Sequence, residues 1–378
     1  ILIGEDIYLY SGSGLLQVDA KRLRSTPISE NSFCGLAVGA AMTGLRPIVD
    51  LTIASFAYLA SDQIINQAAK LHYMTGGRAR IPVVFRASMW HNGSNAAQHS
   101  DRPYPMFMNA PGLKVVAPAT PADMKGLLKS AIRDEDPVMV FEDNDLWFRR
   151  GPCPADPDFL VPIGVADVKR AGGDLTIVSV AGCLPHALEA ADVLAAEGVA
   201  AEVIDVRTLV PLDRETILRS VAKTGRLVVV DYAHRTCGAA AEIAAIVAED
   251  GFASLRRPIQ RVTTPDVNIP FAPALEKPPG ESCEHDHSHA AVGHGHHRGG
   301  RAALAEAARR AGCRRRGHRG DRDGEGRRGT GVTRGRHRAR TAGAGGHDRA
   351  GARADRDRRL SPLEAAYQSP STLKARNW

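Results

Sequence analysis

Strand-like and helical segments alternate along the first 277 residues, and this alternation limits the possible fold more than any other feature of the chain. Short apolar runs such as "RPIVDLT" (46–52) and "IPVVFRA" (81–87) have the length of buried strands. Between them, segments such as "SDQIINQAAKLHYM" (61–74) repeat apolar residues three and four positions apart, as an amphipathic helix does. Strands that alternate with helices form a mostly parallel sheet with both faces covered. The sequence therefore predicts an α/β fold.

The alternation is interrupted once and then restarts. The segment "RRGPCPADPDFLVP" (149–162) is rich in proline and is typical of a linker. We therefore expect two doubly wound, mostly parallel sheet domains, at residues 1–150 and 163–277, joined by a linker at 151–162. The predicted strands are 1–6, 46–52, 81–87, 112–120, 137–143, 174–182, 199–208, 226–233 and 258–265, and the predicted helices are 29–44, 61–74, 121–134, 184–198, 213–225 and 238–251.

Apolar periodicity ends near residue 278, and residues 278–378 are dominated by Arg, Gly, Ala and His. Such a composition buries too little apolar surface to offset chain entropy. Two interpretations stay open: a disordered basic arm, or an aberrant, out-of-frame continuation of the gene. The stretch "CEHDHSHAAVGHGHH" (283–297) could bind Zn²⁺ or Ni²⁺ loosely, although adventitious binding is the simpler interpretation.

Charge, cysteine and hydropathy patterns exclude several classes of function. Residues 1–277 contain 27 basic and 31 acidic residues, whereas the remainder contains 22 basic and 11 acidic residues, so the overall charge of +7 comes from the tail. The folded part thus gives no reason to expect a nucleic-acid partner. The six scattered cysteines favour a reducing cytoplasm. We find no apolar run of the ~18–20 residues that a membrane span needs, and no signal peptide. Because the chain opens without Met, we expect the natural start to lie upstream.

One acidic residue stands at the start of a helix made almost entirely of small residues. In "TPISENSFCGLAVGAAMTGLRPI" (26–48), Ser29 is a candidate N-cap and Glu30 falls in the first turn. An acid there can simply complement the helix dipole. However, the glycines and alanines behind it allow a close approach to the helix backbone. Apolar flanking strands also predict that the carboxylate is partly buried, and a buried carboxylate needs a partner or a proton.

A second candidate lies in the polar loop that follows the strand at 81–87. In "AAQHSD" (96–101), His99 occupies a loop at the carboxyl end of a parallel strand, where α/β sheets hold their ligands. Histidine is the side chain best suited to move protons near neutral pH. A loop histidine is more often structural, and His91 in the same loop weakens a unique assignment.

With these features in place, the chain resembles the β subunit of thiamine-diphosphate-dependent 2-oxoacid dehydrogenases, and also that of acetoin dehydrogenase. The resemblance covers roughly residues 1–277 in order, and it implies a transketolase-like pyrimidine-binding domain followed by a transketolase C-terminal-like domain. The stretches that carry it are "TPISENSFCGLAVGAAMTGLRPI", "YMTGG", "AAQHS", "PGLKVVAPATPADMKGLLKSAIRDEDPV", "EVIDVRTLVPLD" and "RVTTPDVNIPFAPALE".

The resemblance implies roles for particular residues. Glu30 matches a glutamate that hydrogen-bonds to the cofactor's aminopyrimidine ring and so activates it, and Phe56 matches an aromatic residue that packs on that ring. Tyr73 matches an aromatic near the same site, and Glu5 an acid on the path between active sites. His99 matches a histidine that assists substrate binding and acyl transfer. Backbone carbonyls and acids of a structural potassium site are matched by Val83, Ala131, Ile132, Asp134 and Asp136.

The resemblance also implies partners, because one motif of thiamine enzymes is missing. Such enzymes hold Mg²⁺ and the cofactor's diphosphate with a GDG…N motif, and no GDG occurs in this chain. We therefore expect an α subunit to bring the metal and the phosphates in an α2β2 assembly. A lipoyl acyltransferase and a small 2-oxoacid, pyruvate or branched-chain, complete the expected partners, with no nucleic acid and no membrane.

Departures from the family pattern keep alternatives open. The helix that normally precedes "ILIGED" is missing, Thr52 replaces a larger apolar residue, and Trp90 and His91 add bulk at the substrate entrance. The tail replaces a terminal segment that helps dock the acyltransferase. Acetoin cleavage, or a non-catalytic or defective subunit that keeps the fold, are the alternatives to a 2-oxoacid dehydrogenase subunit.

Overall fold

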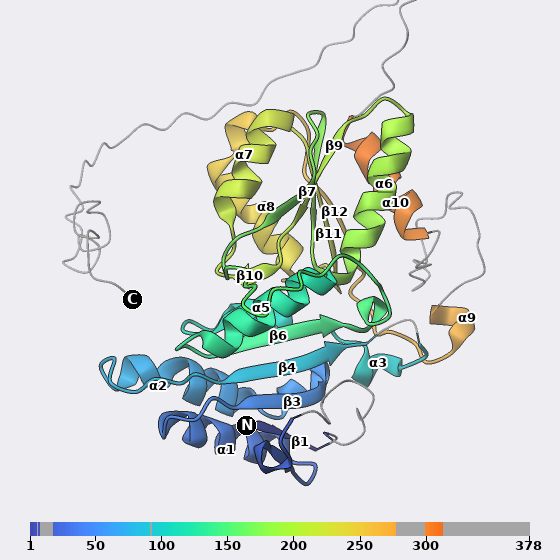
Figure 1. The fold of residues 1–378 in the computed structure, drawn as a ribbon. Coiled ribbons are helices and arrows are strands. Elements are labelled where there is room, and N and C mark those ends of the chain that lie inside the picture. The colour runs from blue at the N-terminus through green and yellow to red at the C-terminus, as the bar shows by residue number, and fades with distance from the viewer. Residues whose placement is uncertain (6, 8–17, 91–92, 277–298, 313–378) are drawn as a thin grey trace, which may run out of the picture. The chain divides into compact units, whose positions relative to one another are not determined.

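The computed structural model describes residues 1–5, 7, 18–90, 93–276 and 299–312. Within them, two sheets account for the alternation in the sequence (Figure 1). The first sheet has seven strands in the order β10-β5-β6-β4-β3-β1-β2, and all its pairs are parallel except β10 with β5. Its strands are β1 Leu2–Gly4, β2 Leu23–Ser25, β3 Ile48–Ile53, β4 Val84–Met89, β5 Lys114–Val116, β6 Val138–Asp143 and β10 Thr208–Val210.

The second sheet has five strands in the order β12-β11-β8-β9-β7. Only β7, at its edge, runs antiparallel to its neighbour. The strands are β7 Asp167–Arg170, β8 Leu175–Ser179, β9 Ala201–Asp205, β11 Leu227–His234 and β12 Gln260–Thr264. The α/β fold with two mostly parallel sheets is thereby confirmed.

Helices cover both faces of each sheet, because alternate residues of the strands are apolar on both sides. In β6, Val138 and Val140 pack with Leu127 of α5 (Pro121–Arg133), whereas Met139 and Phe141 belong to the core on the other face. That other core includes apolar residues of α1 (Glu30–Met42) and of the π-helical segment η4 (Asp62–Ala68), which continues as α2 (Ala69–Met74). Burial on both faces explains why these strands are nearly continuous apolar runs.

The second sheet is covered by α7 (Arg214–Thr224) and α8 (Ala239–Asp250) on one face and by α6 (Leu184–Ala196) and α10 (Gly299–Arg310) on the other (Figure 1). Shorter elements connect the rest: η2 Ala20–Arg22, η3 Ala54–Tyr58, α3 Ala96–His99, α4 Tyr104–Met108, η5 Asn144–Leu146, η6 Ala181–Cys183, η7 Phe252–Ser254 and α9 Pro273–Glu276. None of the helices in these described ranges is long and apolar enough to cross a bilayer.

Every predicted strand and helix is present, with shifted ends, but the structure differs from the prediction in several places. The prediction placed residues 199–208 in a single strand, whereas the chain leaves β9 after Asp205 and enters β10, which pairs with the first sheet. Strands β2 and β7 were not predicted, because each is short, is mostly not buried and so lacks an apolar run. The predicted helix at 61–74 begins as a π-helix.

The expectation that helical periodicity ends at residue 278 is wrong for one stretch. Residues Gly299–Arg310 form α10, and its apolar side buries Leu304, Ala307 and Ala308 in one core with α6 and β8. Arg309 also pairs with Glu197 at 2.8 Å. The remaining tail, including the histidine-rich stretch at 283–297, lies outside the described residues.

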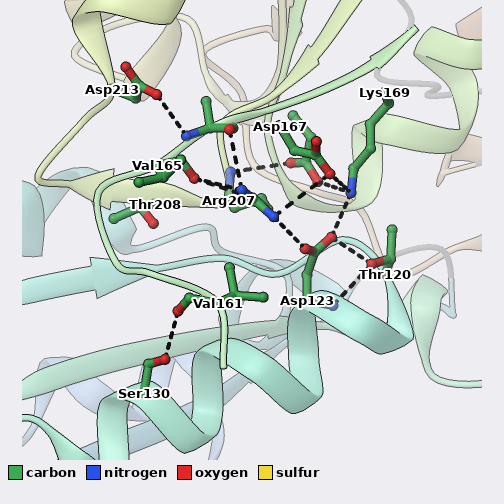
Figure 2. A network of polar contacts seen from close by, with 12 residues as sticks. Thr120, Asp123, Ser130, Val161, Val165, Asp167, Lys169, Arg207, Thr208 and Asp213 are labelled. Carbon is green, nitrogen blue, oxygen red and sulfur yellow. Dashed lines mark hydrogen bonds and ion pairs between the residues drawn. The ribbon is translucent and has the colours of Figure 1, made fainter. Parts of the chain in front are cut away.

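A buried polar network links α5 to strands of the second sheet (Figure 2). Asp123 accepts from Arg207 Nη1 at 2.9 Å and from Lys169 Nζ at 2.8 Å. Burial raises the pKa of Asp123. The two hydrogen bonds, together with a third from Thr120, lower it, and the pKa is lowered overall. Asp205, fully buried beside Lys169, behaves in the opposite way, because burial raises its pKa to about 7.

Candidate active site

The candidate residues follow the carboxyl ends of neighbouring parallel strands. Glu5 follows β1, Glu30 opens the helix after β2, Phe56 lies in η3 directly after β3, and His99 ends the short helix α3 after β4. Thr26 donates its N–H to Gly4 O at 3.0 Å, which ties the segment before Glu30 to the end of β1. Since carboxyl ends of parallel strands share one edge of a sheet, the topology gathers these elements at the edge where α/β proteins bind ligands.

Glu30 is the first residue of α1, and only 4% of it is exposed. The hydroxyl of Ser29 bonds to Ser32 Oγ at 2.8 Å rather than to a backbone N–H of the helix. Within the described residues, no hydrogen bond or ion pair engages the Glu30 carboxylate, and neither of its oxygens belongs to the fully buried unpaired atoms, so the carboxylate is still reachable by a ligand. The helix dipole offsets part of the cost of burying this charge. A buried carboxylate that accepts no hydrogen bond from the protein is nevertheless suited to accept a hydrogen bond from a ligand.

The helix behind Glu30 packs closely on η4. A Cβ added at Gly35 would come within 2.9 Å of Gln63 Oε1, so only glycine permits this approach without a shift of Gln63. One turn from Glu30, burial and the Glu30 charge raise the pKa of the Cys34 thiol. Cys34 therefore stays protonated and adds no second negative charge to the site.

The rings of Phe56 and His99 meet edge to face, with centroids 5.5 Å apart and an interplanar angle of 70°. The Ser55 hydroxyl donates to the carbonyl of Gln98, so η3 and α3 are tied next to both rings. Two segments 43 residues apart in sequence thus hold an aromatic ring against an imidazole. This arrangement joins the two residues that were predicted to pack on a cofactor ring and to handle the substrate.

Part of the backbone strain among the described residues falls in these segments, and the rest lies at Ala181, Arg207 and Cys237. Thr52, Ser94 and Ala96 have φ values of 60°, 56° and 60°, in the left-handed region that is rare for residues with a Cβ, above all a β-branched one. The Thr52 hydroxyl is buried and has no hydrogen-bond partner in the described part of the chain. Its N–H is held by Asp50 Oδ1 at 2.9 Å. Strained residues of this kind gather at ligand sites, where the surroundings hold them in place.

Two further predicted residues, Tyr73 and Glu5, differ in their positions. Tyr73 lies near the end of α2 and is 76% exposed. Glu5 lies at the carboxyl edge, where its carbonyl accepts from Ser25 Oγ at 3.3 Å. The roles predicted for both stay predictions.

The five residues of the predicted potassium site lie around the end of α5, but cationic side chains of the chain itself already bind there. Arg46 donates to the carbonyls of Ile132 at 3.0 Å and Asp134 at 2.7 Å. Lys114 pairs with Asp134 at 2.7 Å and with Asp136 at 3.1 Å. Ala131 O accepts from Asp134 N, and Val83 O accepts from Val138 N. In the described ranges, no group of three or more His, Cys, Asp or Glu side chains could hold a metal ion.

Sequence reasoning missed several buried polar contacts near the site. Glu276 of α9 accepts from Ser94 N at 2.7 Å, across 182 residues of sequence. Arg86 bonds to Asp50 at 2.8 Å and to Glu142 at 2.7 Å, beneath the strand ends. The residues of each pair are far apart in sequence, so a sequence motif could not reveal the pairing. The only hint in the sequence is that Asp50, Arg86 and Glu142 are charged residues within apolar strands.

Comparisons with known proteins identify the domains that form this fold. The family model of the transketolase pyrimidine binding domain matches residues 4–147, and that of the transketolase C-terminal domain matches residues 164–285. A solved structure described as a split gene transketolase, inactive β4 tetramer, is 26% identical, covers 71% of this chain and 83% of its own, and has a TM-score of 0.59. The fold and the matched domains define a transketolase-like protein.

Curated relatives identify the family within that class. The acetoin:2,6-dichlorophenolindophenol oxidoreductase subunit beta of Cupriavidus necator is 45% identical over 73% of this chain and 86% of its own length. The 2-oxoisovalerate dehydrogenase subunit beta of Bacillus subtilis is 40% identical over 73% of this chain and 86% of its own length. The pyruvate dehydrogenase E1 component subunit beta of Rhizobium meliloti is 45% identical over 73% of this chain and 61% of its own length. The chain belongs to the thiamine-dependent family of E1 β subunits of pyruvate, branched-chain 2-oxoacid and acetoin dehydrogenases.

Proposed function

We propose that this chain is the β subunit of the decarboxylating component of a 2-oxoacid dehydrogenase complex, active only with an α subunit. The observation that carries the proposal is Glu30, a buried carboxylate at the carboxyl edge of the first sheet that lacks a donor among the described residues. Such a carboxylate is suited to accept a hydrogen bond from a protonated nitrogen of a cofactor ring.

The residues present fit the pyrimidine half of thiamine diphosphate. Glu30 would accept a hydrogen bond from the aminopyrimidine ring and hold the proton that it shares with it. Phe56, half-buried and next to His99, would give that flat ring an aromatic surface to pack on. When bound, the cofactor supplies the nucleophilic carbon that cleaves the bond next to the 2-oxo group. His99 would bind the substrate or move a proton during transfer of the acyl group to a lipoyl acceptor.

The other half of the site falls to the partner in this proposal. The chain has no GDG motif, and the structure describes no acidic cluster that could hold Mg²⁺. An α subunit would therefore supply the metal and the diphosphate contacts, in an α2β2 assembly. A bound potassium ion stays a prediction, since Arg46 already bonds to two of the carbonyls expected to hold it. Cytoplasmic location stays a prediction as well.

Acetoin cleavage is the second candidate, because the acetoin relatives match as strongly as the 2-oxoacid relatives do. The relative from Cupriavidus necator is 45% identical over 86% of its length. Trp90, whose indole N–H is buried without a partner in the described residues, lies directly after β4 and could distinguish the substrates.

The test is co-expression of the full chain with an α subunit that carries the GDG…N motif. We expect a heteromer that turns over pyruvate, a branched-chain 2-oxoacid or acetoin in a thiamine-diphosphate-dependent reaction, with an artificial acceptor dye as the readout. The substrate that gives the highest kcat/KM decides between the two candidates. A heteromer that forms but turns over none of the three with the cofactor present would contradict the proposal.

A further inference from the structure

The loop that carries His99 is held from a distant part of the chain by Glu276. Glu276 lies in α9, is 4% exposed, and accepts a hydrogen bond from Ser94 N at 2.7 Å. Its second oxygen, Oε1, is buried and has no hydrogen-bond partner in the part of the chain that the structure describes. Among the described residues, the carboxylate therefore makes one hydrogen bond, and it is to the backbone of the loop.

This contact meets the loop at its strained turn. Ser94 and Ala96 have φ values of 56° and 60°, and the helix α3, which ends at His99, starts at Ala96. A turn of this kind persists only when its surroundings hold it. The loop is fixed at a second point by the Ser55 hydroxyl, which donates to the carbonyl of Gln98 next to His99. One hydrogen bond therefore holds the turn at Ser94, and the other holds the segment after it at Gln98, next to His99.

We infer that Glu276 is a positioning residue for His99: by holding Ser94 N it fixes the turn that orients the imidazole toward the substrate. The inference rests on the proposed function, because it assigns Glu276 to the same site. Glu276 acts through the loop backbone and needs only an acceptor oxygen at this position. The amide of glutamine keeps such an oxygen, whereas alanine removes it.

The experiment compares Glu276→Ala, Glu276→Gln, His99→Ala and the double variant Glu276→Ala/His99→Ala in the full-length heteromer with the α subunit. We expect Glu276→Ala to lower kcat/KM by about 10- to 100-fold, as misplacement of a catalytic group does. Glu276→Gln should stay within about 3-fold of wild type, because the acceptor is kept. In the His99→Ala background, Glu276→Ala should cause no further loss, since residues that act as a unit are not additive.

Asp213→Ala is the matched control. Asp213 also accepts from backbone N–H groups, of Ala166 and Thr216 at 3.0 Å each, but it caps α7 away from the loop. Its effect, whatever its size, should be the same with and without His99. An equal loss from Glu276→Ala in both backgrounds, or no loss at all in an active heteromer, would overturn the inference.

Hydrogen exchange of the free chain separates this inference from the proposed function. In Glu276→Ala, the peptide that covers residues 93–100 should exchange faster, while α6 and α8 keep their protection. Unchanged exchange at Ser94, or faster exchange throughout the chain, would overturn the role of Glu276, whether or not the heteromer is active. Loss of the proposed function would instead appear as a wild-type heteromer without thiamine-dependent turnover.

Discussion

At the scale of single residues, Thr52 shows how the sequence departs from ordinary backbone rules where the site lies. It combines a β-branched side chain with a φ of 60° and a buried hydroxyl without a partner among the described residues. In the free chain, Thr52→Val keeps the shape and removes the unsatisfied hydroxyl, and we expect it to raise the free energy of unfolding by about 1 kcal/mol. Thr52→Gly should remove the backbone strain and so raise the free energy of unfolding by about 1 kcal/mol or more.

Urea unfolding of the free chain, followed by circular dichroism, measures both Thr52 variants. Thr176 is a useful contrast, because its buried hydroxyl bonds to Ser220 and Thr224 at 2.7 Å. Thr176→Val should therefore be destabilising by about 1–3 kcal/mol, since it leaves buried partners unsatisfied. If Thr52→Val destabilises the chain as much as Thr176→Val, the Thr52 hydroxyl has a partner and this account of it is wrong.

At the scale of elements, the network between α5, β7 and β9 contains two carboxyls with opposite responses to pH. Burial raises the pKa of Asp205 to about 7, from the 3.8 that is usual for an aspartate. A carboxyl whose pKa is higher in the folded chain favours folding at low pH and loses that contribution as the pH rises from about 4 to about 7. We therefore expect Asp205→Asn to gain stability relative to wild type over that interval, on the order of 2–4 kcal/mol.

Asp123→Asn is the contrast for this experiment. Hydrogen bonds from Lys169 and Arg207 give Asp123 a lowered pKa, so its contribution is present above about pH 4 and is lost as the pH falls. Asp123→Asn should therefore be destabilising at pH 7 and less so in acid. Thermal unfolding between about pH 2 and 8 covers both titrations, and a wild-type-like pH profile for Asp205→Asn would refute the assignment.

Helix α10 gives a second prediction at this scale, because it tests whether part of the tail belongs to the fold. Leu304 is 1% exposed and packs in the core shared by α6 and β8. Leu304→Ala should lower the free energy of unfolding by about 2–4 kcal/mol, the usual effect of deleting a buried leucine side chain. Arg301→Ala, on the exposed side, should have almost no effect. Equal stability of the two variants in urea would mean that α10 does not pack as described.

The elements also show what the sequence could and could not predict. Long apolar runs such as β6 and periodic helices such as α5 were predictable, because each carries its own pattern. The three-residue strands β2 and β10 form only because neighbouring strands offer free edges, which local sequence does not record. Helix α10 was missed because it consists mainly of alanine and arginine. The same residues dominate the low-complexity tail, so the helix does not stand out from it.

At the scale of the whole molecule, the family resemblance gave candidate site residues, whereas the contacts that hold them follow only from the folded chain. Glu30, Phe56 and His99 were predicted through the family resemblance, and the structure places Glu30 in a buried position and Phe56 against His99. The contact between Glu276 and Ser94 spans 182 residues and follows only from the folded chain. The exposed Tyr73, and the exposed Leu36 and Met42 on α1, fit a chain that completes its surface with a partner subunit.

The most direct test of the central claim is thiamine-dependent turnover by the α-subunit heteromer that contains Glu30→Gln. Glu242→Gln is its control, because Glu242 also lies in the first turn of a helix but is exposed. We predict that Glu30→Gln forms the heteromer normally and loses at least about 100-fold in kcat, whereas Glu242→Gln keeps wild-type activity. Near-wild-type turnover by Glu30→Gln would show that Glu30 only complements the helix dipole and would contradict the account.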